Sequence, residues 1–262
     1  MTAFPPAKSI DLKGKKGLVI GIANDQSIAW GCASAMHALG AEIAVTYLSS
    51  RAEPFVRPLA EQLGSPLIMP CDVEVPGELD AVFQAIRQQW GTLDFVLHAV
   101  AFAAKDDLHG RVIDCQASGF ARAMDVSCHS FIRMARLAEP LMQHGGTLLT
   151  TSYYGAQKVV DQYNLMGPVK AALEAVVREL AAELGAAGIR VHALSPGPVL
   201  TRAASGIEHF DQIMAESLQR APQHKLVTIE QVGALAAWLA TDWADGMSGN
   251  VVFVDGGRHV MS

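Results

Sequence analysis

Three side chains near the middle of the chain are of the right type to do chemistry on an oxygen atom: Tyr153, Tyr163 and Lys170. Tyr163 precedes Lys170 by seven residues. This is nearly two turns of an α-helix, so both would lie on one helix face. A helical lysine leans back toward the helix N-terminus and could reach the phenol. Because a nearby cation makes a phenol more acidic, the pair predicts a site that stabilises or protonates a developing oxyanion.

A competing pair, Tyr154 and Lys158, stands just upstream. The preceding apolar run ends near Ser152, which places Tyr154 in a loop where no helix would hold a lysine beneath it. A Tyr–Lys pair on a helix is most often only a surface contact. The position of Tyr163 and Lys170 at the start of a long apolar-periodic helix favours those two as the catalytic pair. We interpret Tyr154 and Lys158 as a decoy.

The elements that would hold these residues alternate between short apolar runs and longer helical patterns. This alternation predicts an α/β fold, a single-domain doubly wound parallel sheet of the Rossmann type with helices on both faces. One domain would span residues 1–262, and the long irregular stretch at about 196–226, which carries a weak helix, is typical of a substrate lid. Strands are predicted at 17–23, 42–48, 66–73, 93–101, 146–151, 189–194 and 250–254, and helices at 27–39, 52–63, 78–90, 117–142 (broken at Pro140), 163–184 and 228–241.

The first three predicted strands end in residues that could bind a dinucleotide. Gly21 leads into a helix beginning near Ser27, whose free N–H groups would suit a pyrophosphate, although an ordinary turn with Ser27 as N-cap is an equal alternative. The three-glycine fingerprint is absent. No carboxylate stands near Leu48 to bind a ribose 2′-hydroxyl, and Arg51 could meet a 2′-phosphate or simply be solvated. Asp72 could bond an adenine amino group or cap a turn.

Composition narrows the classes of function. Half of the 262 residues are hydrophobic and 18% are charged, which provides for a large core and argues against disorder. The net charge of −6 without a basic run argues against nucleic acid and anionic membranes as partners. The N-terminus has no signal-peptide pattern, and no apolar run reaches membrane-spanning length. Histidines and cysteines show no ligand or disulfide spacing, so we expect no metal and a reducing cytoplasm; the cysteines are Cys32, Cys71, Cys115 and Cys128.

Taken together, these residues resemble the enoyl-acyl-carrier-protein reductases of bacterial fatty-acid synthesis, a divergent branch of the short-chain dehydrogenases. The resemblance runs from about Leu12 to Gly257. Its most specific parts are the spacing from Tyr163 to Lys170 and the Ala-Ala-Ser-Gly-Ile segment. It is carried by Gly21 with Ser27-Ile28-Ala29, Cys71-Asp72-Val73, Tyr153, Tyr163-Asn164-x-Met166-Gly167-x-x-Lys170, Thr201-x-Ala203-Ala204-Ser205-Gly206-Ile207 and Val254-Asp255-Gly256-Gly257.

The resemblance implies roles for particular residues. Tyr163 would hydrogen-bond the thioester carbonyl, Lys170 would hold the nicotinamide ribose, Tyr153 would line the site and assist, and Ala103 would touch substrate. A mobile lid would cover the acyl chain at about 203–214. The dinucleotide would be lined by Gly21, Ser27, Ile28, Leu48, Asp72, Val73, Val100, Lys170, Val199, Leu200, Thr201, Arg202 and Ala203.

The reaction that the resemblance implies is reduction of a trans-2-enoyl thioester. Hydride would reach C3 from NADH, with NADPH possible, and an enolate would develop at the thioester oxygen before C2 is protonated. The thioester would be presented on acyl carrier protein to a cytoplasmic homotetramer. Two alternatives stay open: a carbonyl reductase or alcohol dehydrogenase on the same fold, and a nucleotide-sensing regulator without turnover.

The chain also departs from the family pattern. Ala101 stands where the family usually has glycine after the fourth strand, and the polar side chain common at Leu48 is missing. Asp161-Gln162 replaces the more usual Pro-Asn before Tyr163. These differences make a diverged paralogue a further alternative.

Overall fold

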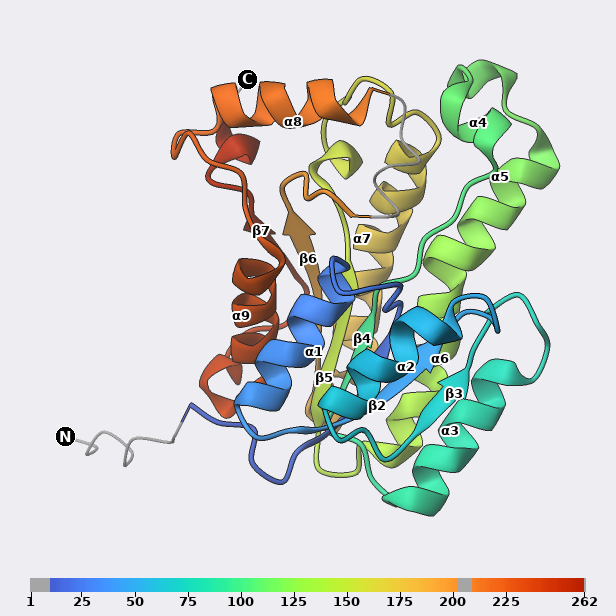
Figure 1. Cartoon of the computed structure of the whole chain (residues 1–262), viewed down its shortest axis with the longest axis vertical. Helices are drawn as coiled ribbons and strands as arrows, with labels where there is room; N and C mark the ends of the chain where they lie inside the picture. The colour runs from blue at the N-terminus through green and yellow to red at the C-terminus, as the bar shows by residue number, and fades with distance from the viewer. Residues whose placement is uncertain (1–9, 202–208, 262) are drawn as a thin grey trace.

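The computed structural model describes residues 10–201 and 209–261, built around one parallel β-sheet (Figure 1). The strand order is β3-β2-β1-β4-β5-β6-β7, and every neighbouring pair is parallel. This confirms the predicted doubly wound α/β fold. The strands are β1 (Lys16–Ile20), β2 (Glu42–Tyr47), β3 (Ile68–Pro70), β4 (Phe95–His98), β5 (Gly146–Thr151), β6 (Ile189–Pro196) and β7 (Asn250–Val254).

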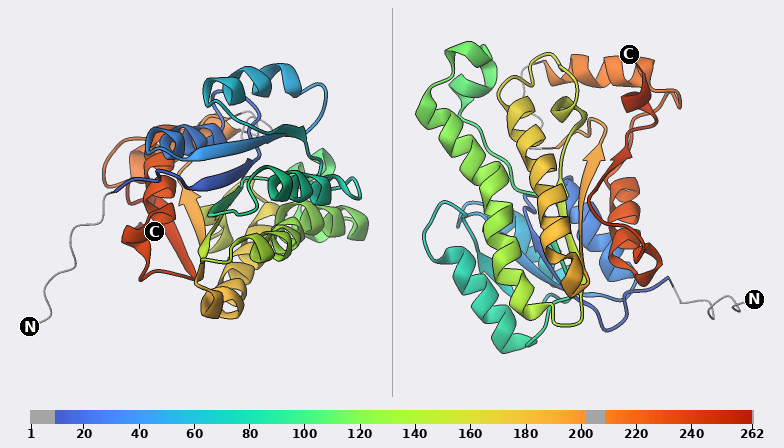
Figure 2. Two further views of the ribbon diagram at one scale, coloured as in Figure 1. Left: turned by 90° about the horizontal axis from the view of Figure 1, so that it is seen from below. Right: turned by 180° about the vertical axis from the view of Figure 1, so that it is seen from behind.

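The sheet is buried on both faces, which explains why its strands read as unbroken apolar runs. Successive side chains of a strand point to opposite faces. In β1, Leu18 and Ile20 enter one core cluster and Val19 enters the other. Fully burying such a side chain contributes about 1.5–3 kcal/mol. The alternation therefore anchors a helix layer on each side of the sheet, as the left panel of Figure 2 shows.

Each face of the sheet has its own set of helices. Residues of α1, α2 and α9 share one core cluster, and residues of α3, α6 and α7 share the other. The second set lies toward the viewer in the right panel of Figure 2. The bounds are α1 (Ile28–Ala38), α2 (Glu53–Gln62), α3 (Glu78–Gln89), α4 (Lys105–His109), α5 (Ala117–Met124), α6 (Ser130–Ala138), α7 (Met166–Leu184), α8 (Phe210–Arg220) and α9 (Ile229–Ala240).

Several predicted strands extend too far at their carboxyl ends. β1 ends at Ile20 and β4 at His98, whereas the apolar runs continue to residues 23 and 101. The amide of Ala99 still bonds the carbonyl of Ile20 at 2.9 Å, after which the two chains diverge into loops. Ala101 is therefore an exposed loop residue rather than the end of a buried strand. The prediction for β3 was also too long at both ends.

The predicted helix at 163–184 begins three residues later, at Met166. Gln162 and Asn164 have φ values of 65° and 41°, in the left-handed region, so the chain cannot be helical there. Tyr163 therefore lies in a tight turn before α7, which corrects its expected place on the helix.

The predicted helix at 117–142 is divided in two, and it also ends before residue 142. A π-helical turn at Asp125–His129 separates α5 from α6. Such single turns occur often at functional sites. The helix ends at Ala138 and a short 3₁₀ turn at Glu139–Leu141 follows, so the break expected at Pro140 is confirmed.

Candidate active site

Because all seven strands are parallel, their carboxyl ends share one edge of the sheet, where α4 and α8 rise above it in Figure 1. The strand order reverses between β1 and β4, the place where doubly wound sheets bind ligands. Gly21 follows β1 with φ at 113°, and a Cβ there would collide with the carbonyl of Ala99 after β4. Only glycine allows the two loops to approach this closely.

The first loop leads into the N-terminus of α1, which Ser27 caps. Its hydroxyl accepts from the Trp30 amide at 3.4 Å and donates to the Asn24 carbonyl at 2.7 Å. Ser27 is thus the N-cap of α1, as one of the two alternatives from the sequence predicted. It is compatible with an anion site, because the positive end of the helix dipole still faces the loop after β1.

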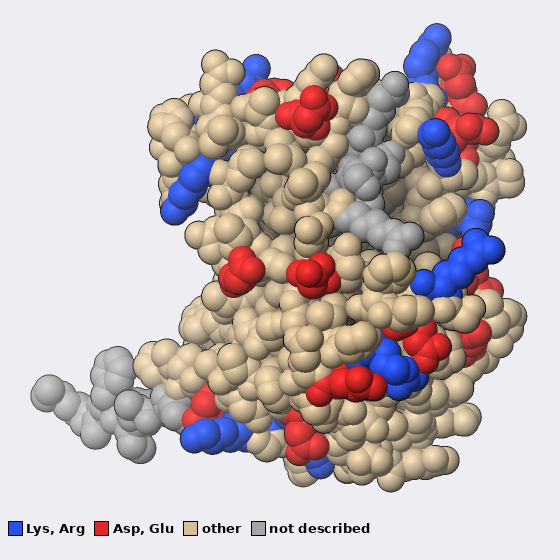
Figure 3. All heavy atoms as spheres, in the orientation of Figure 1, with Lys and Arg blue, Asp and Glu red and all other residues tan. Residues whose placement is uncertain are grey.

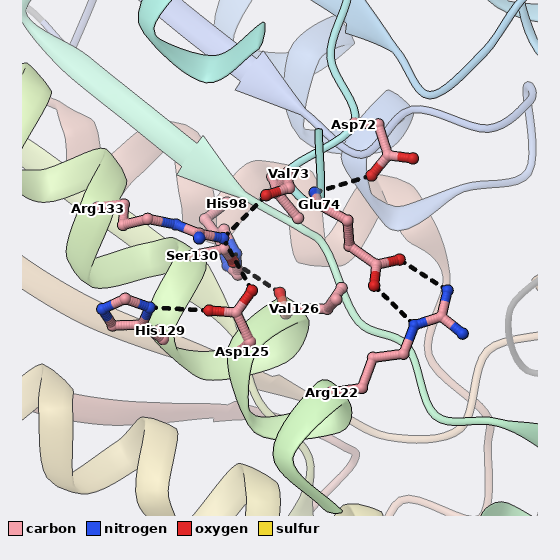
Figure 4. Close-up of polar contacts among 10 residues, drawn as sticks. All are labelled: Asp72, Val73, Glu74, His98, Arg122, Asp125, Val126, His129, Ser130 and Arg133. Atoms are coloured by element: carbon pink, nitrogen blue, oxygen red, sulfur yellow. Dashed lines mark hydrogen bonds and ion pairs between the residues drawn. The ribbon is translucent and has the colours of Figure 1, made fainter. Parts of the chain in front are cut away.

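The residues after β2 are exposed to solvent, whereas those after β3 are held by hydrogen bonds. Leu48 is 60% exposed and Arg51 is also exposed. A carboxylate oxygen of Asp72 accepts from the Glu74 amide at 2.9 Å, so Asp72 does cap a turn (Figure 4). The next residue, Val73, is buried, and its carbonyl accepts from the Arg133 guanidinium at 2.9 Å.

Two helical residues that sequence reasoning missed fix these loops. The hydroxyl of Ser127, in the π turn, bonds both the amide and the carbonyl of Phe102 at 2.9 and 3.1 Å. Arg122 makes two hydrogen bonds to Glu74, at 2.6 and 2.8 Å, and its guanidinium lies 4.3 Å from the centroid of the Phe102 ring. Arg122 therefore joins the loop after β3 to the loop after β4, and Figure 4 shows its bonds to Glu74.

Tyr163 is enclosed by groups from three segments. Its ring meets that of Tyr153 edge-on, with centroids 4.8 Å apart. A Cβ on Gly155 would strike the Tyr163 ring, so this glycine leaves room for the phenol. Asn164 ties the turn to α4 by donating to the Leu108 carbonyl at 2.8 Å. Ala103 packs against the same cluster, which places the predicted substrate residue beside the phenol.

Lys170 is 4% exposed, and its Nζ donates to the carbonyl of Thr151 at 2.6 Å. Burial lowers the pKa of Lys170 to about 8. Burial raises the pKa of Tyr163 well above its usual range, and the neighbouring Tyr153 and Glu174 add to that rise. The expectation that Lys170 makes Tyr163 more acidic is therefore corrected, because desolvation dominates. Tyr163 is thus a protonated phenol at neutral pH and can donate a hydrogen bond.

Tyr153 is also a protonated phenol at neutral pH, because burial raises its pKa to about 12. Tyr154 has a different environment. It lies in a 3₁₀ turn at Tyr154–Ala156, and the guanidinium of Arg258 lies 5.2 Å from its ring centroid. The Lys158 side chain is exposed to solvent. This geometry supports the interpretation of Tyr154 and Lys158 as a decoy.

The segment after β6 completes the site edge. Val199 and Thr201 are half-buried, whereas Leu200 is exposed. Arg202 and Ala203 lie outside the described residues, as does the whole of the Ala-Ala-Ser-Gly-Ile segment. Beside this edge, a cavity of about 100 Å³ has Tyr153, Gly197, Ile213, Glu216 and Arg258 in its lining.

Comparison with known proteins identifies the family. Residues 21–259 match the family described as "Enoyl-(Acyl carrier protein) reductase". The chain belongs to the enoyl-(acyl carrier protein) reductase family. It is 47% identical over 250 residues to enoyl-[acyl-carrier-protein] reductase [NADH] 1 of Rhizobium meliloti, a match that covers 95% of this chain and 92% of the relative.

Solved structures of enoyl-(acyl carrier protein) reductases share the fold over nearly the whole chain. The reductase of Anaplasma phagocytophilum in complex with NAD is 49% identical, with a TM-score of 0.92 and 96% of each chain covered. The Bacillus cereus reductase, with NADP⁺ and indole naphthyridinone, is 43% identical, with a TM-score of 0.93 and coverage of 96% of this chain and 99% of that one.

Membership of the enoyl-(acyl carrier protein) reductase family confirms the predicted resemblance, the predicted enzyme class and the predicted reduction of an enoyl thioester with a nicotinamide cofactor. It favours this reaction over carbonyl reduction and over a regulator without turnover. The loop junction at Gly21, the helix N-terminus at Ser27 and the buried cation of Lys170 fit a dinucleotide that carries a pyrophosphate and a ribose.

Three further observations bear on partners of this reductase. Among residues 10–201 and 209–261, no helix is long and apolar enough to cross a membrane. The same ranges contain no cluster of histidine, cysteine and acidic side chains that could hold a metal ion. On the face shown in Figure 3, lysines and arginines are scattered among acidic residues rather than gathered.

Proposed function

We propose that Tyr163 donates the hydrogen bond to the thioester carbonyl when this enzyme reduces a trans-2-enoyl thioester. The observation that carries this role is the burial of a protonated phenol, 7% exposed, edge-on to Tyr153. When bound, NADH supplies the hydride that reaches C3 of the enoyl chain. The Tyr163 hydroxyl then faces the oxygen on which negative charge develops, so its hydrogen bond strengthens toward the transition state.

Lys170 holds the nicotinamide ribose and Tyr153 lines the acyl site in this proposal. The Lys170 side chain is held in one position, because its Nζ donates a hydrogen bond to the Thr151 carbonyl. Tyr153 restricts the orientation of the Tyr163 ring through the edge-on contact. Ala103, which packs against the same apolar cluster, contacts the substrate.

The dinucleotide lies along the loops at the carboxyl edge of the sheet. The pyrophosphate faces the N-terminus of α1, and the exposed Leu48 leaves room beside the adenosine ribose. NADH is the cofactor, and NADPH is a possible substitute. The residues proposed to line it are Gly21, Ser27, Ile28, Leu48, Asp72, Val73, Val100, Lys170, Val199, Leu200 and Thr201, with Arg202 and Ala203 outside the described ranges.

The remaining proposals concern the protein as a whole. The chain is one domain with α8 as part of a lid at about 196–226, and it works in the cytoplasm on a thioester carried by acyl carrier protein. It assembles as a homotetramer. Support for assembly comes from apolar side chains exposed on and beside α5 and α6, namely Ile113, Phe120 and Ile132. Burying such groups against another copy would remove apolar surface from water.

One assay tests the function. Oxidation of NADH and NADPH is followed by absorbance with crotonyl thioesters and, in parallel, with simple ketones. Turnover of the thioesters alone is expected. Turnover of ketones alone would instead support carbonyl reduction, and cofactor binding without turnover of either class would support a regulator.

A further inference from the structure

α7 carries a second buried charged residue one turn after Lys170. Glu174 is 4% exposed, and burying a carboxylate is costly unless its oxygens are hydrogen-bonded. One oxygen accepts from the Ser152 hydroxyl at 2.6 Å, and the other accepts from the Gln157 amide at 3.1 Å. The bond from Ser152 is short, as expected when the acceptor carries charge. This carboxylate has no part in the mechanism described above.

Ser152 lies between two residues of the catalytic region. Thr151, before it, provides the carbonyl that holds Lys170, and Tyr153, after it, packs on Tyr163. The segment 151–153 is thus tied to α7 at two successive turns, by Lys170 through a backbone carbonyl and by Glu174 through a side-chain hydroxyl. If the Glu174 contact were lost, the position of Tyr153 and the anchor of Lys170 would both be less constrained.

Glu174 also acts on Lys170 through its charge. The groups that interact electrostatically with Lys170 include Cys128 from the π turn and His98 from β4. Burial holds the pKa of His98 at about 3, so this ring is neutral. Burial raises the pKa of the Cys128 thiol, and Lys170 acts in the opposite direction. Cys128 and then Glu174 oppose the lowering of the Lys170 pKa by burial, and of these two Glu174 is the carboxylate held in place by hydrogen bonds.

We propose that Glu174 is a positioning residue of the reductase, which fixes the 151–153 segment through Ser152 and keeps Lys170 positively charged at neutral pH. The proposal rests on the role given above to Lys170 in holding the nicotinamide ribose. Glu174 itself acts only through Ser152 and Lys170, not by touching the substrate or the dinucleotide.

The test measures the dissociation constant of NADH against pH, by protein fluorescence, across the range in which a buried lysine titrates, about pH 6 to about 10. Affinity for NADH in the wild type should fall as pH rises through about 8, because Lys170 then loses its proton. In Glu174→Gln the midpoint should move down by about half a pH unit or more, so binding above the midpoint should be about threefold weaker.

Two further variants separate the effect of the Glu174 charge on Lys170 from the effect of Glu174 on the position of the 151–153 segment. Ser152→Ala keeps the carboxylate, so it should retain the wild-type pH midpoint while kcat falls about tenfold through loosening of the 151–153 segment. Gln157→Ala removes the other hydrogen-bond partner of Glu174 and should change neither the midpoint nor kcat. Thermal unfolding of each variant checks that the fold is retained.

An unchanged midpoint in folded Glu174→Gln would overturn the electrostatic part, and wild-type kcat in Ser152→Ala would overturn the positional part. The second result decides the proposal even if Glu174→Gln does not fold. A different result is expected if Lys170 does not hold the nicotinamide ribose at all. In that case Lys170→Ala binds NADH as tightly as wild type, and the wild-type affinity does not fall near pH 8.

Discussion

The rings of Tyr153 and Tyr163 meet at an interplanar angle of 63°, so the edge of one phenol rests on the face of the other. The contact joins the loop after β5 to the turn before α7. Edge-to-face pairs of this kind contribute about 0.5–1.5 kcal/mol beyond their buried area. The orientation of the Tyr163 hydroxyl is therefore set before any substrate arrives.

Replacing Tyr163 with phenylalanine should remove the hydroxyl and leave this packing in place. Loss of one preorganised donor to a developing oxyanion lowers kcat by about 10²–10³-fold, or about 2.7–4 kcal/mol. The dissociation constant of NADH should stay close to wild type. Steady-state kinetics and fluorescence titration measure the two effects. Tyr154→Phe is the matched control and should retain turnover; the reverse pattern would restore Tyr154 and Lys158 as the catalytic pair.

Lys170→Ala should weaken NADH binding. Hydrogen bonds to a charged group are worth about 1.5–3 kcal/mol, so the dissociation constant should rise roughly 10- to 150-fold at neutral pH. Fluorescence titration measures the change, and Lys158→Ala, which alters an exposed lysine, should bind NADH normally. Wild-type affinity in Lys170→Ala would show that the lysine does not hold the ribose.

Ser127→Ala should destabilise the protein and loosen the loop after β4. The Ser127 hydroxyl is fully buried and satisfies both backbone groups of Phe102. Leaving such a group unsatisfied costs about 1–3 kcal/mol. For a chain of this size, each kcal/mol lowers the melting temperature by about 2–4 °C. KM for the enoyl thioester should also rise. Ser118→Ala, on the exposed surface of α5, is the control, and equal melting curves for the two variants would contradict the prediction.

NADH should be preferred over NADPH, with a higher kcat and a lower KM. Leu48 offers no hydrogen bond to a 2′-phosphate, and Arg51 is exposed three residues further along. Arg51→Ala should therefore leave NADH kinetics unchanged and weaken whatever use of NADPH remains. Kinetics with both cofactors test this directly. A lower KM together with a higher kcat for NADPH would reverse the assignment.

Periodicity alone located most of the elements. β5 and β7 have the predicted bounds, because both are short runs of apolar and β-branched residues bounded by polar or glycine residues. Strand ends were less predictable. The apolar run through Val100 continues into the loop after β4, because that loop is partly buried against a core cluster.

The side chains proposed as catalytic were chosen from the sequence, but their geometry could not be predicted from it. The start of α7 depends on left-handed conformations at Gln162 and Asn164, neither of which is glycine. The anchor of Lys170 is a backbone carbonyl, which no side-chain pattern reveals. Glu174 could have been noticed as an acid one helical turn beyond Lys170 on a face that also carries apolar residues. The pairing of Arg122 with Glu74 joins residues far apart in the sequence and left no local signal.

The π turn at Asp125–His129 makes the loop contacts depend on the length of the chain as well as on its composition. Such a turn holds one residue more than a regular α-helix would need. If that residue stayed in the chain but the turn were regular α-helix, α5 would be rotated by about 100° relative to α6, since an α-helix has about 3.6 residues per turn. Arg122 would then face away from Glu74. The wider turn therefore absorbs the extra residue and keeps the loops after β3 and β4 joined, whereas one more residue inserted into regular helix between Arg122 and α6 would separate them.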